Sequence, residues 1–220
     1  MVLSNTNMRH ERKYRILHQS FAFVQQMIRH HPRGFRSLYP DRQVNNIYLD
    51  TPQLQCYRDN VAGLAERRKY RIRWYGPMKT AIINNPQLEI KLKNDLLGDK
   101  QVYPFSAFNL SDYRRIGTTV QEVLALPMAL QPTLLNSYQR SYYGLPNQKF
   151  RITIDQKLGY APLWQESDHP AIRYTDAGII VEIKYEKGLE KEADEILQYL
   201  PFRVTKNSKY VSGIALMNAV

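Results

Sequence analysis

The sequence predicts an α+β fold in which an antiparallel eight-stranded β-barrel with a polar, basic bore is flanked by helices. Three observations lead to this prediction. Charged and apolar residues alternate in segment after segment, and because successive side chains of a strand point to opposite faces, the charges gather on one side. About eight such segments occur, which is enough to close a small barrel. Amphipathic helical patterns between them can cover the apolar outer faces.

The first part of the chain is expected to hold a leader, a strand, a helix and a loop. Residues 1–9 read as a loose leader, and residues 10–16 alternate as a short strand. Apolar residues at helical spacing over positions 17–28 predict an amphipathic helix that ends near His31 and Pro32. Residues 32–43 are expected to be a turn-rich loop.

A strand and a short helix are expected next. Residues 45–50 predict the strand. Residues 52–62 predict the helix, because Thr51 is a good N-cap, proline at position 52 suits the first helical position, and Gly63 suits the exit.

The most basic strand is expected over residues 66–75. Its alternating residues are Arg67, Lys69, Arg71 and Arg73 on one face, and Arg68, Tyr70, Ile72 and Trp74 on the other. A single basic strand is often the solvated outer face of a sheet. The recurrence of the pattern in other strands favours a bore lined with cations instead.

The middle of the chain combines one strong pattern with weaker ones. Residues 88–94 predict a strand with leucine and isoleucine on one face and charges on the other. Residues 94–99 predict a loop. Residues 105–130 have a helical pattern that is broken at Gly117 and Pro127.

The last part of the chain begins with a predicted hairpin. Residues 136–143 and 149–155 predict two strands joined by a turn at 144–147, and residues 156–177 look irregular. A strand over 179–185, a helix over 189–200, a last strand over 202–206 and a C-terminal helix capped by Ser208 complete the chain.

Composition favours an anionic partner and one domain. The 220 residues carry a formal net charge of +11, which is typical of proteins that bind nucleic acid, a membrane surface or a polyphosphorylated molecule. No linker divides residues 10–220, so these form a single domain. The sole cysteine, Cys56, excludes an internal disulfide, and no signal peptide or membrane-spanning run is found. We therefore expect a cytoplasmic protein.

Three Glu-x-Lys motifs carry the predicted chemistry, at 11–13, 89–91 and 182–184. Each places a carboxylate beside an ammonium on one strand face, because positions i and i+2 share a face. Arginine and lysine side chains bind phosphate oxygens, and carboxylates among them hold Mg²⁺ or Mn²⁺, so the set suits phosphoryl transfer. Phosphate-binding glycine loops, His-Glu-x-x-His and Gly-x-Ser-x-Gly are absent from the sequence.

The ordered motifs resemble one known family. They are Glu-Arg-Lys-Tyr at 11–14, Tyr-Leu-Asp-Thr-Pro at 48–52, Arg-x-Arg at 71–73, Glu-Ile-Lys at 89–91, Tyr-x-Arg at 138–140, Arg-Ile-Thr-Ile-Asp at 151–155, Glu-Ile-Lys at 182–184 and Ser-Lys-Tyr at 208–210. Together, over residues 9–216, they resemble the VTC (vacuolar transporter chaperone) polyphosphate polymerase domain. That domain belongs to the triphosphate tunnel metalloenzymes, the CYTH-like superfamily.

The resemblance implies an eight-stranded tunnel that transfers the ATP γ-phosphate to polyphosphate with Mn²⁺ or Mg²⁺, releasing ADP. It implies phosphate-binding roles for Lys13, Arg71, Arg73, Lys91, Arg140, Arg151, Lys184 and Lys209. It places Tyr138 near the nucleotide and Ser208 at the phosphate, with Lys100 as a looser match. Glu182 is the implied metal ligand, and Glu89 and Glu11 support the metal or balance the lysines.

Two other functions fit the same residues. In the first, water replaces the phosphate acceptor, and the protein hydrolyses triphosphate, nucleoside triphosphates or short polyphosphate. In the second, the protein binds RNA or another polyanion without catalysis, although interleaved carboxylates are of no use in a groove for a phosphate backbone. We expect ATP and polyphosphate as partners, with neither nucleic acid nor a membrane segment. The sequence does not determine the oligomeric state.

Overall fold

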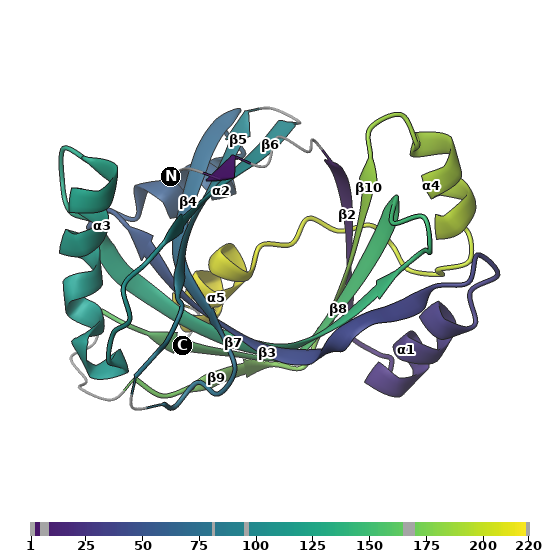
Figure 1. Ribbon diagram of the computed structural model, residues 1–220, viewed down its shortest axis with the longest axis horizontal. Helices are drawn as coiled ribbons and strands as arrows, with labels where there is room; N and C mark the ends of the chain where they lie inside the picture. Colours follow the sequence, from purple (N-terminus) through teal and green to yellow (C-terminus); the bar gives the residue numbers. More distant parts are fainter. Residues whose placement is uncertain (1–2, 5–8, 81, 95–96, 165–169, 219–220) are drawn as a thin grey trace.

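One curled antiparallel sheet forms the frame of the molecule (Figure 1). The computed structural model describes residues 3–4, 9–80, 82–94, 97–164 and 170–218. Hydrogen-bonded neighbours follow the order β1-β6-β5-β4-β3-β7-β8-β10-β2, and β9 pairs with β8. The strands are β1 (Leu3–Ser4), β2 (Arg9–Ile16), β3 (Arg36–Asp50), β4 (Glu66–Tyr75), β5 (Gln87–Asn94), β6 (Leu97–Pro104), β7 (Gln131–Gly144), β8 (Phe150–Pro162), β9 (Tyr174–Asp176) and β10 (Ile179–Glu186).

The helices lie on both sides of this sheet. They are α1 (Phe21–Arg29), α2 (Gln55–Ala62), the 3₁₀ helix η1 (Leu110–Arg115), α3 (Ile116–Leu124), α4 (Glu190–Leu197) and α5 (Lys209–Asn218). Figure 1 shows α3 outside one limb of the curl, α1 and α4 outside the other, and α5 on the concave side. The prediction of a sheet flanked by helices is confirmed, and α5 inside the curl was not foreseen.

The sheet is curled but not closed. Its eight long strands run from β6 to β2, and within the described residues no ladder joins these two ends. The prediction of an antiparallel eight-stranded wall is confirmed, whereas closure of the barrel by hydrogen bonds is wrong. The physical reason is that the second hydrogen-bonding edge of each end strand is partly occupied, that of β6 by β1 and that of β2 by Val204 and Thr205.

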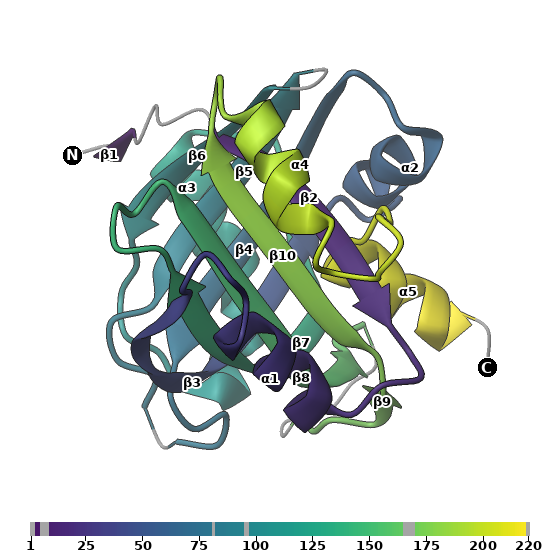
Figure 2. The ribbon, with the colours of Figure 1, turned by 90° about the vertical axis from the view of Figure 1, so that its right-hand side faces the viewer.

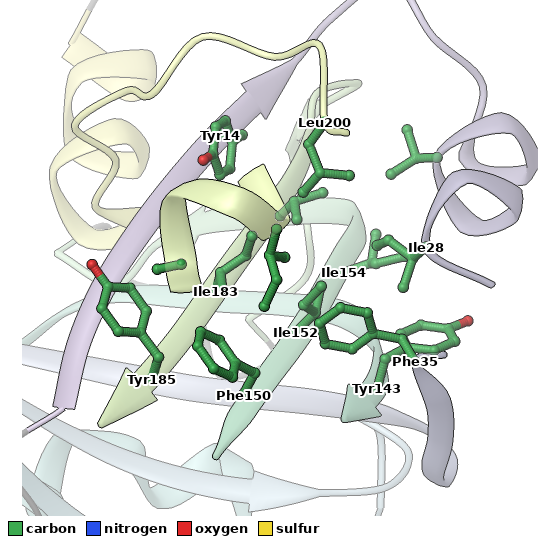
Figure 3. Close-up of a cluster of buried hydrophobic side chains, with 14 of the residues drawn as sticks. Tyr14, Ile28, Phe35, Tyr143, Phe150, Ile152, Ile154, Ile183, Tyr185 and Leu200 are labelled. Carbon is green, nitrogen blue, oxygen red and sulfur yellow. The ribbon is translucent and has the colours of Figure 1, made fainter. Parts of the chain in front are cut away.

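Two apolar clusters cover the outer face of the sheet. The first joins β2, β8 and β10 to α1 and α4, which lie over β10 and β8 in Figure 2. Figure 3 shows Ile183 and Ile152 of the sheet among Ile28 of α1, Phe150 and Leu200. The second cluster packs η1 and α3 against the outer faces of β3, β4 and β5. Apolar faces outward under helices are what the alternation predicts.

A third apolar cluster lies on the concave side. Tyr210 and Ile214 of α5 pack against Tyr48 of β3 and Leu134 of β7. Part of the concave side is therefore an apolar core, so the predicted polar, basic bore does not extend through the section that α5 occupies.

Several strand and loop predictions need correction. The loop expected over residues 32–43 is mostly strand, because β3 starts at Arg36 and pairs with β7 through register shifts that interrupt any alternation. In the loop expected over residues 94–99, β6 starts at Leu97, paired with β5. In the region 156–177, expected to be irregular, β8 continues to Pro162 and β9 pairs beside it. Residues 165–169 lie outside the described part.

The last predicted strand, 202–206, is wrong. This segment makes an isolated bridge between Val204 and Tyr14 and a hydrogen bond from Thr205 N to Lys13 O at 2.7 Å. It lies along β2 without forming a ladder. Of the leader predicted over residues 1–9, residues 1–2 and 5–8 lie outside the described part, Leu3 pairs with Val102, and Arg9 begins β2.

The helix boundaries also differ from the prediction. Ser20 caps α1, accepting from Phe23 N at 3.2 Å, so Leu17 precedes the helix. Asp50 organises the start of α2 by accepting from Cys56 N at 2.8 Å and Tyr57 N at 2.9 Å, whereas Thr51 accepts from Gln55 N. Gly63 ends α2 in the left-handed region, as predicted.

Candidate functional site

The concave face of the sheet, called the interior face here, collects the predicted charges. Strand register places opposite one another the pairs Lys13 and Glu182, Arg71 and Glu89, Lys69 and Lys91, and Arg151 and Lys184. Its charged residues include Glu11, Lys13, Lys69, Arg71, Arg73, Glu89, Lys91, Lys100, Arg140, Arg151, Asp155, Glu182 and Lys184. Lys209 joins them from α5.

Glu89 is a buried carboxylate held by three cations. Arg71 donates to it from Nε at 2.7 Å, Lys100 Nζ lies at 3.0 Å, and Arg73 Nη1 at 3.6 Å. Burial opposes its ionisation, but the charges of Arg71, Arg73 and Lys100 outweigh burial and hold the pKa of Glu89 well below its usual range. The carboxylate, on β5, therefore fixes the orientation of three side chains that lie on its two neighbouring strands, β4 and β6.

Arg73 also donates hydrogen bonds to buried side chains of β3 and β7. Its Nε donates to Asn46 Oδ1 at 2.9 Å, and its Nη2 to Tyr138 Oη at 3.2 Å. Asn46 in turn donates to Asn136 Oδ1 at 3.3 Å. These partners are buried, so the guanidinium direction is set by the protein.

Asp155 forms a second buried anchor. Arg140 binds both of its oxygens, with Nε 2.5 Å from Oδ1 and Nη2 2.7 Å from Oδ2, and Lys209 Nζ lies 2.5 Å from Oδ2. Despite burial, the charges of Arg140 and Lys209 lower the pKa of Asp155. Arg140 and Lys209 also cover the ring of Tyr138, at 5.3 and 4.7 Å from its centre.

Glu11 and Glu182 form a pair of neighbouring carboxylates. They lie within hydrogen-bonding reach of each other, and Lys184 Nζ is 3.0 Å from Glu182 and 3.9 Å from Glu11. Lys13 pairs with Glu11, and Lys91 lies 3.4 Å from it. Although burial opposes ionisation, Lys184, Lys13 and Arg140 hold the pKa of Glu182 well below its usual range.

This pair fits a divalent cation that also binds phosphate. Mg²⁺ and similar hard cations are commonly held by one or two carboxylates, with substrate phosphates and water completing the shell. Among the described residues, no group of three or more histidine, cysteine, aspartate or glutamate side chains gathers as a metal site. Glu11 and Glu182 are therefore the neighbouring carboxylates that could hold such a cation, whereas Glu89 lies among Arg71, Arg73 and Lys100.

Lys69 reaches the start of α5. Its Nζ donates to Ser208 Oγ at 2.9 Å, and that hydroxyl accepts from Val211 N at 3.4 Å, in keeping with the predicted cap. Burial and the charges of Lys91, Lys13, Arg67 and Arg71 lower the pKa of Lys69 to about 7. With Lys209 bound to Asp155, the first residues of α5 contact β4 and β8 at once.

Two buried polar atoms on β8 have no hydrogen-bond partner within the described protein. They are Arg151 Nε and Thr153 Oγ1. Both residues lie on the interior face, opposite Lys184 and Glu182 in the ladder with β10. Because buried polar groups are almost always hydrogen-bonded, these two point to a polar ligand at this wall.

Sequence reasoning found most of these residues and missed others. Lys69 and Asp155 were not assigned roles, although Lys69 precedes Arg71 by two positions and Asp155 follows Arg151 by four, which places them on the same faces. Asn46 and Thr153 carry no local signal. The roles assigned to individual residues from the resemblance stay predictions.

Comparison with known proteins identifies a family and a shared fold. A family model described as the VTC domain matches residues 8–218. No curated protein matches the chain. None of the helices in the described part combines the length and apolar character needed to cross a membrane.

Solved structures share the fold at low identity. A candidate adenylate cyclase from Vibrio parahaemolyticus is 13% identical, with a TM-score of 0.55, over 96% of this chain and 99% of that chain. A Pyrococcus horikoshii protein is 14% identical, with a TM-score of 0.53, over 95% and 99%. A candidate adenylate cyclase from Bacillus halodurans is 14% identical, with a TM-score of 0.51, over 92% and 95%. Identities this low establish the fold alone.

Proposed function

The chain belongs to the VTC domain family, and on that premise we propose that it is a polyphosphate polymerase that transfers the γ-phosphate of ATP to polyphosphate. The observation that carries the proposal is the excess of fixed positive charge on the interior face. Ten cations named above face four carboxylates, Glu11, Glu89, Asp155 and Glu182. A polyanion with many oxygens is the ligand that such a wall stabilises.

The partners of these cations support phosphate binding over RNA binding. Glu89 orients Arg71, Arg73 and Lys100, and Asp155 orients Arg140 and Lys209. Side chains held in advance lose little conformational entropy when a phosphate chain binds. A groove for a nucleic-acid backbone has no use for four carboxylates between its cations.

The proposed reaction needs positioning more than acid–base chemistry. A terminal oxygen of the polyphosphate acceptor forms a bond to the γ-phosphorus, and the bond from that phosphorus to the β–γ bridging oxygen breaks, so ADP leaves and the acceptor gains one phosphate. The attacking oxygen is already an anion, so no general base is required. Arginine and lysine side chains stabilise the charge on the transferred group, which is the main source of catalysis in phosphoryl transfer.

Glu182 and Glu11 would hold the divalent cation, Mn²⁺ or Mg²⁺, of this reaction. When bound, that cation neutralises charge on phosphate oxygens. Lys184 and Lys13 contact these carboxylates and keep the pKa of Glu182 low, so Glu182 is anionic at neutral pH. Arg151 Nε and Thr153 Oγ1, which lack protein partners, would donate to phosphate oxygens beside the pair.

Product analysis tests the proposal. The purified protein is incubated with ATP and Mn²⁺, and the products are run on a gel stained for polyphosphate while ADP, orthophosphate, pyrophosphate and cyclic AMP are assayed. A ladder of polymer with matching ADP is expected. Three other results would refute the polymerase. Orthophosphate without polymer would favour the hydrolase alternative, and cyclic AMP with pyrophosphate would favour a cyclase. ATP left intact would favour a polyanion-binding protein.

A substitution links the activity to the carboxylate pair. Glu182→Ala is expected to lower the rate of metal-dependent ADP release by about 100-fold or more, because even residues that only support metal ligands are worth 10- to 100-fold. Glu192→Ala, an exposed glutamate on α4, is the matched control and should leave the rate unchanged. An unaffected rate in Glu182→Ala would refute the assigned role.

A further inference from the structure

Three tyrosines surround one arginine at an end of the interior face. The guanidinium carbon of Arg42 lies 5.3 Å from the ring centre of Tyr39, 5.8 Å from that of Tyr75 and 5.8 Å from that of Tyr142. The rings of Tyr39 and Tyr142 meet edge to face, with centres 5.7 Å apart. We call Tyr39, Tyr75, Tyr142 and Arg42 the tyrosine rim.

The tyrosine rim adjoins the phosphate-binding cations proposed above. Arg42 and Arg140 are direct partners in the ladder of β3 with β7. Tyr75 follows Arg73, and Tyr142 follows Arg140, by two positions on the same face of a strand, a spacing of about 7 Å. A ligand whose phosphates contact Arg73 and Arg140 can therefore place a further group on the tyrosine rim.

The rim is accessible to a planar group, whereas Tyr138 is not. Tyr39 and Tyr75 each have 47% of their surface exposed. Tyr138 has 2% exposed, and Arg140 and Lys209 lie over its ring. The aromatic surface that a ligand reaches beside the cations therefore belongs to the rim.

The chemistry of the rim differs from that of the rest of the interior face. Phosphate oxygens gain nothing from aromatic rings, but a nucleobase stacks on tyrosine and on the plane of a guanidinium. Tyrosine rings already held by Arg42 have little freedom left to lose on stacking. The occupant that matches aromatic rings beside phosphate-binding arginines is a nucleoside triphosphate.

We propose that the tyrosine rim binds the nucleobase of a nucleoside triphosphate whose phosphates lie along Arg140 and Arg73. This inference rests on the proposed function for the presence of a nucleotide and adds where its base binds. Stacking on a π-face tolerates every base, so the rim separates nucleoside triphosphates from inorganic tripolyphosphate and does not separate ATP from GTP.

Binding measurements on rim variants test this inference. Tyr75→Leu, Tyr142→Leu and the double variant are titrated calorimetrically with ATP, GTP and inorganic tripolyphosphate in the presence of Mg²⁺. The double variant is expected to bind ATP and GTP about tenfold more weakly, from the worth of one stacked base, with tripolyphosphate affinity unchanged. Tyr199→Leu is the matched control, since Tyr199 is 49% exposed and contacts His31 away from the rim.

Three outcomes would overturn the inference. These are an unchanged ATP affinity, an equal loss for ATP and tripolyphosphate, or a loss for ATP but not GTP. If Tyr142→Leu folds poorly, the ratio of ATP to tripolyphosphate affinity in Tyr75→Leu alone decides, since Tyr75 is exposed. The proposed function is refuted by a different result. If the protein makes no polymer but the rim variants lose their preference for ATP over tripolyphosphate, base binding at the tyrosine rim is supported and the polymerase activity is refuted.

Discussion

Glu89 illustrates how one buried residue organises several others. Its carboxylate contacts Arg71, Arg73 and Lys100, which come from β4 and β6 on either side of its own strand. Removing one partner of such a cluster leaves buried charge uncompensated, which costs more than the interaction is worth. The contacts favour a role for Glu89 in positioning cations, while its predicted support of a metal ion stays a prediction.

Lys69 leads to a prediction about protons at the residue scale. Burial, Lys91, Lys13, Arg67 and Arg71 lower its pKa to about 7, so at pH 8 only about one-tenth of Lys69 is protonated in the free protein. A phosphate chain among these cations favours the ammonium form and raises that pKa. Binding of tripolyphosphate at pH 8 is therefore expected to take up protons.

Calorimetry in two buffers of different ionisation enthalpy measures this uptake. Lys69→Met should reduce the number of protons taken up per tripolyphosphate, whereas Lys191→Met, an exposed lysine on α4, should not. The same uptake in Lys69→Met as in the unaltered protein would contradict the prediction. The same lowered pKa also gives the sign of the effect of pH on folding stability. Lys69 is protonated in both the folded and the unfolded protein below about pH 7, and there its charge destabilises the folded state. This cost is relieved as the pH rises from 7 toward 10.5.

At the scale of elements, α5 connects parts of the sheet that are far apart in sequence. Ser208 accepts from Lys69 of β4, and Lys209 binds Asp155 of β8. Further along, Tyr210 donates to Asp50, whose carboxylate also caps α2. The helix thus holds the interior face in shape and presents its first residues to the cations there.

The contact of α3 with the sheet gives a prediction about one glycine. Gly117 was expected to break the helical pattern, but it lies inside α3, and a Cβ there would meet the carbonyl oxygen of Leu130 at 1.8 Å. Gly117→Ala must therefore move α3 away from the start of β7. We expect a loss of stability of about 2 kcal/mol or more, measured by chemical denaturation.

A neighbouring substitution is the control for that measurement. Thr118 is exposed on the same helix, and Thr118→Ala removes no close contact of this kind. Alanine has the higher helix propensity, so this variant should be neutral or slightly more stable. Equal effects of Gly117→Ala and Thr118→Ala would show that the close approach does not limit stability.

At the scale of the whole molecule, the interior face has an excess of positive charge, and the sheet that carries it is not closed by hydrogen bonds between β6 and β2 in the described residues. The sheet ends at β6 and at β2, and Lys91 of β5 contacts Glu11 of β2 at 3.4 Å without a ladder between them in the described residues. Cations outnumber carboxylates on the interior face, so the free protein carries unfavourable repulsion there. A polyanion bound as proposed would relieve that repulsion and would contact both ends of the sheet.

Thermal unfolding measures this relief. Tripolyphosphate at 100 times its Kd is expected to raise Tm by about 5–10 °C, from about 2.7 kcal/mol of linkage energy in a chain of this size. Because the interaction is largely electrostatic, the shift should shrink in 0.5 M NaCl. Orthophosphate at matched ionic strength is the control, and a shift equal to that of tripolyphosphate would contradict binding of a phosphate chain.

The sequence by itself determined which residues share a face. Alternation with period two put Arg71 and Arg73 on the interior face with Lys91 and Lys184, and their strands formed as predicted. Such alternation is a local property of the backbone, so it can be read without knowing what a strand pairs with.

Only the tertiary structure decided which of these residues meet. Asp155, Arg140 and Lys209 come from β8, β7 and α5, and no spacing in the sequence pairs them. β6 is a strand because β5 offers it a hydrogen-bonding edge, and residues 202–206 are not a strand although they look like one. Strand pairing, the open seam and the place of α5 depend on contacts between distant segments, and local periodicity carries no information about those contacts.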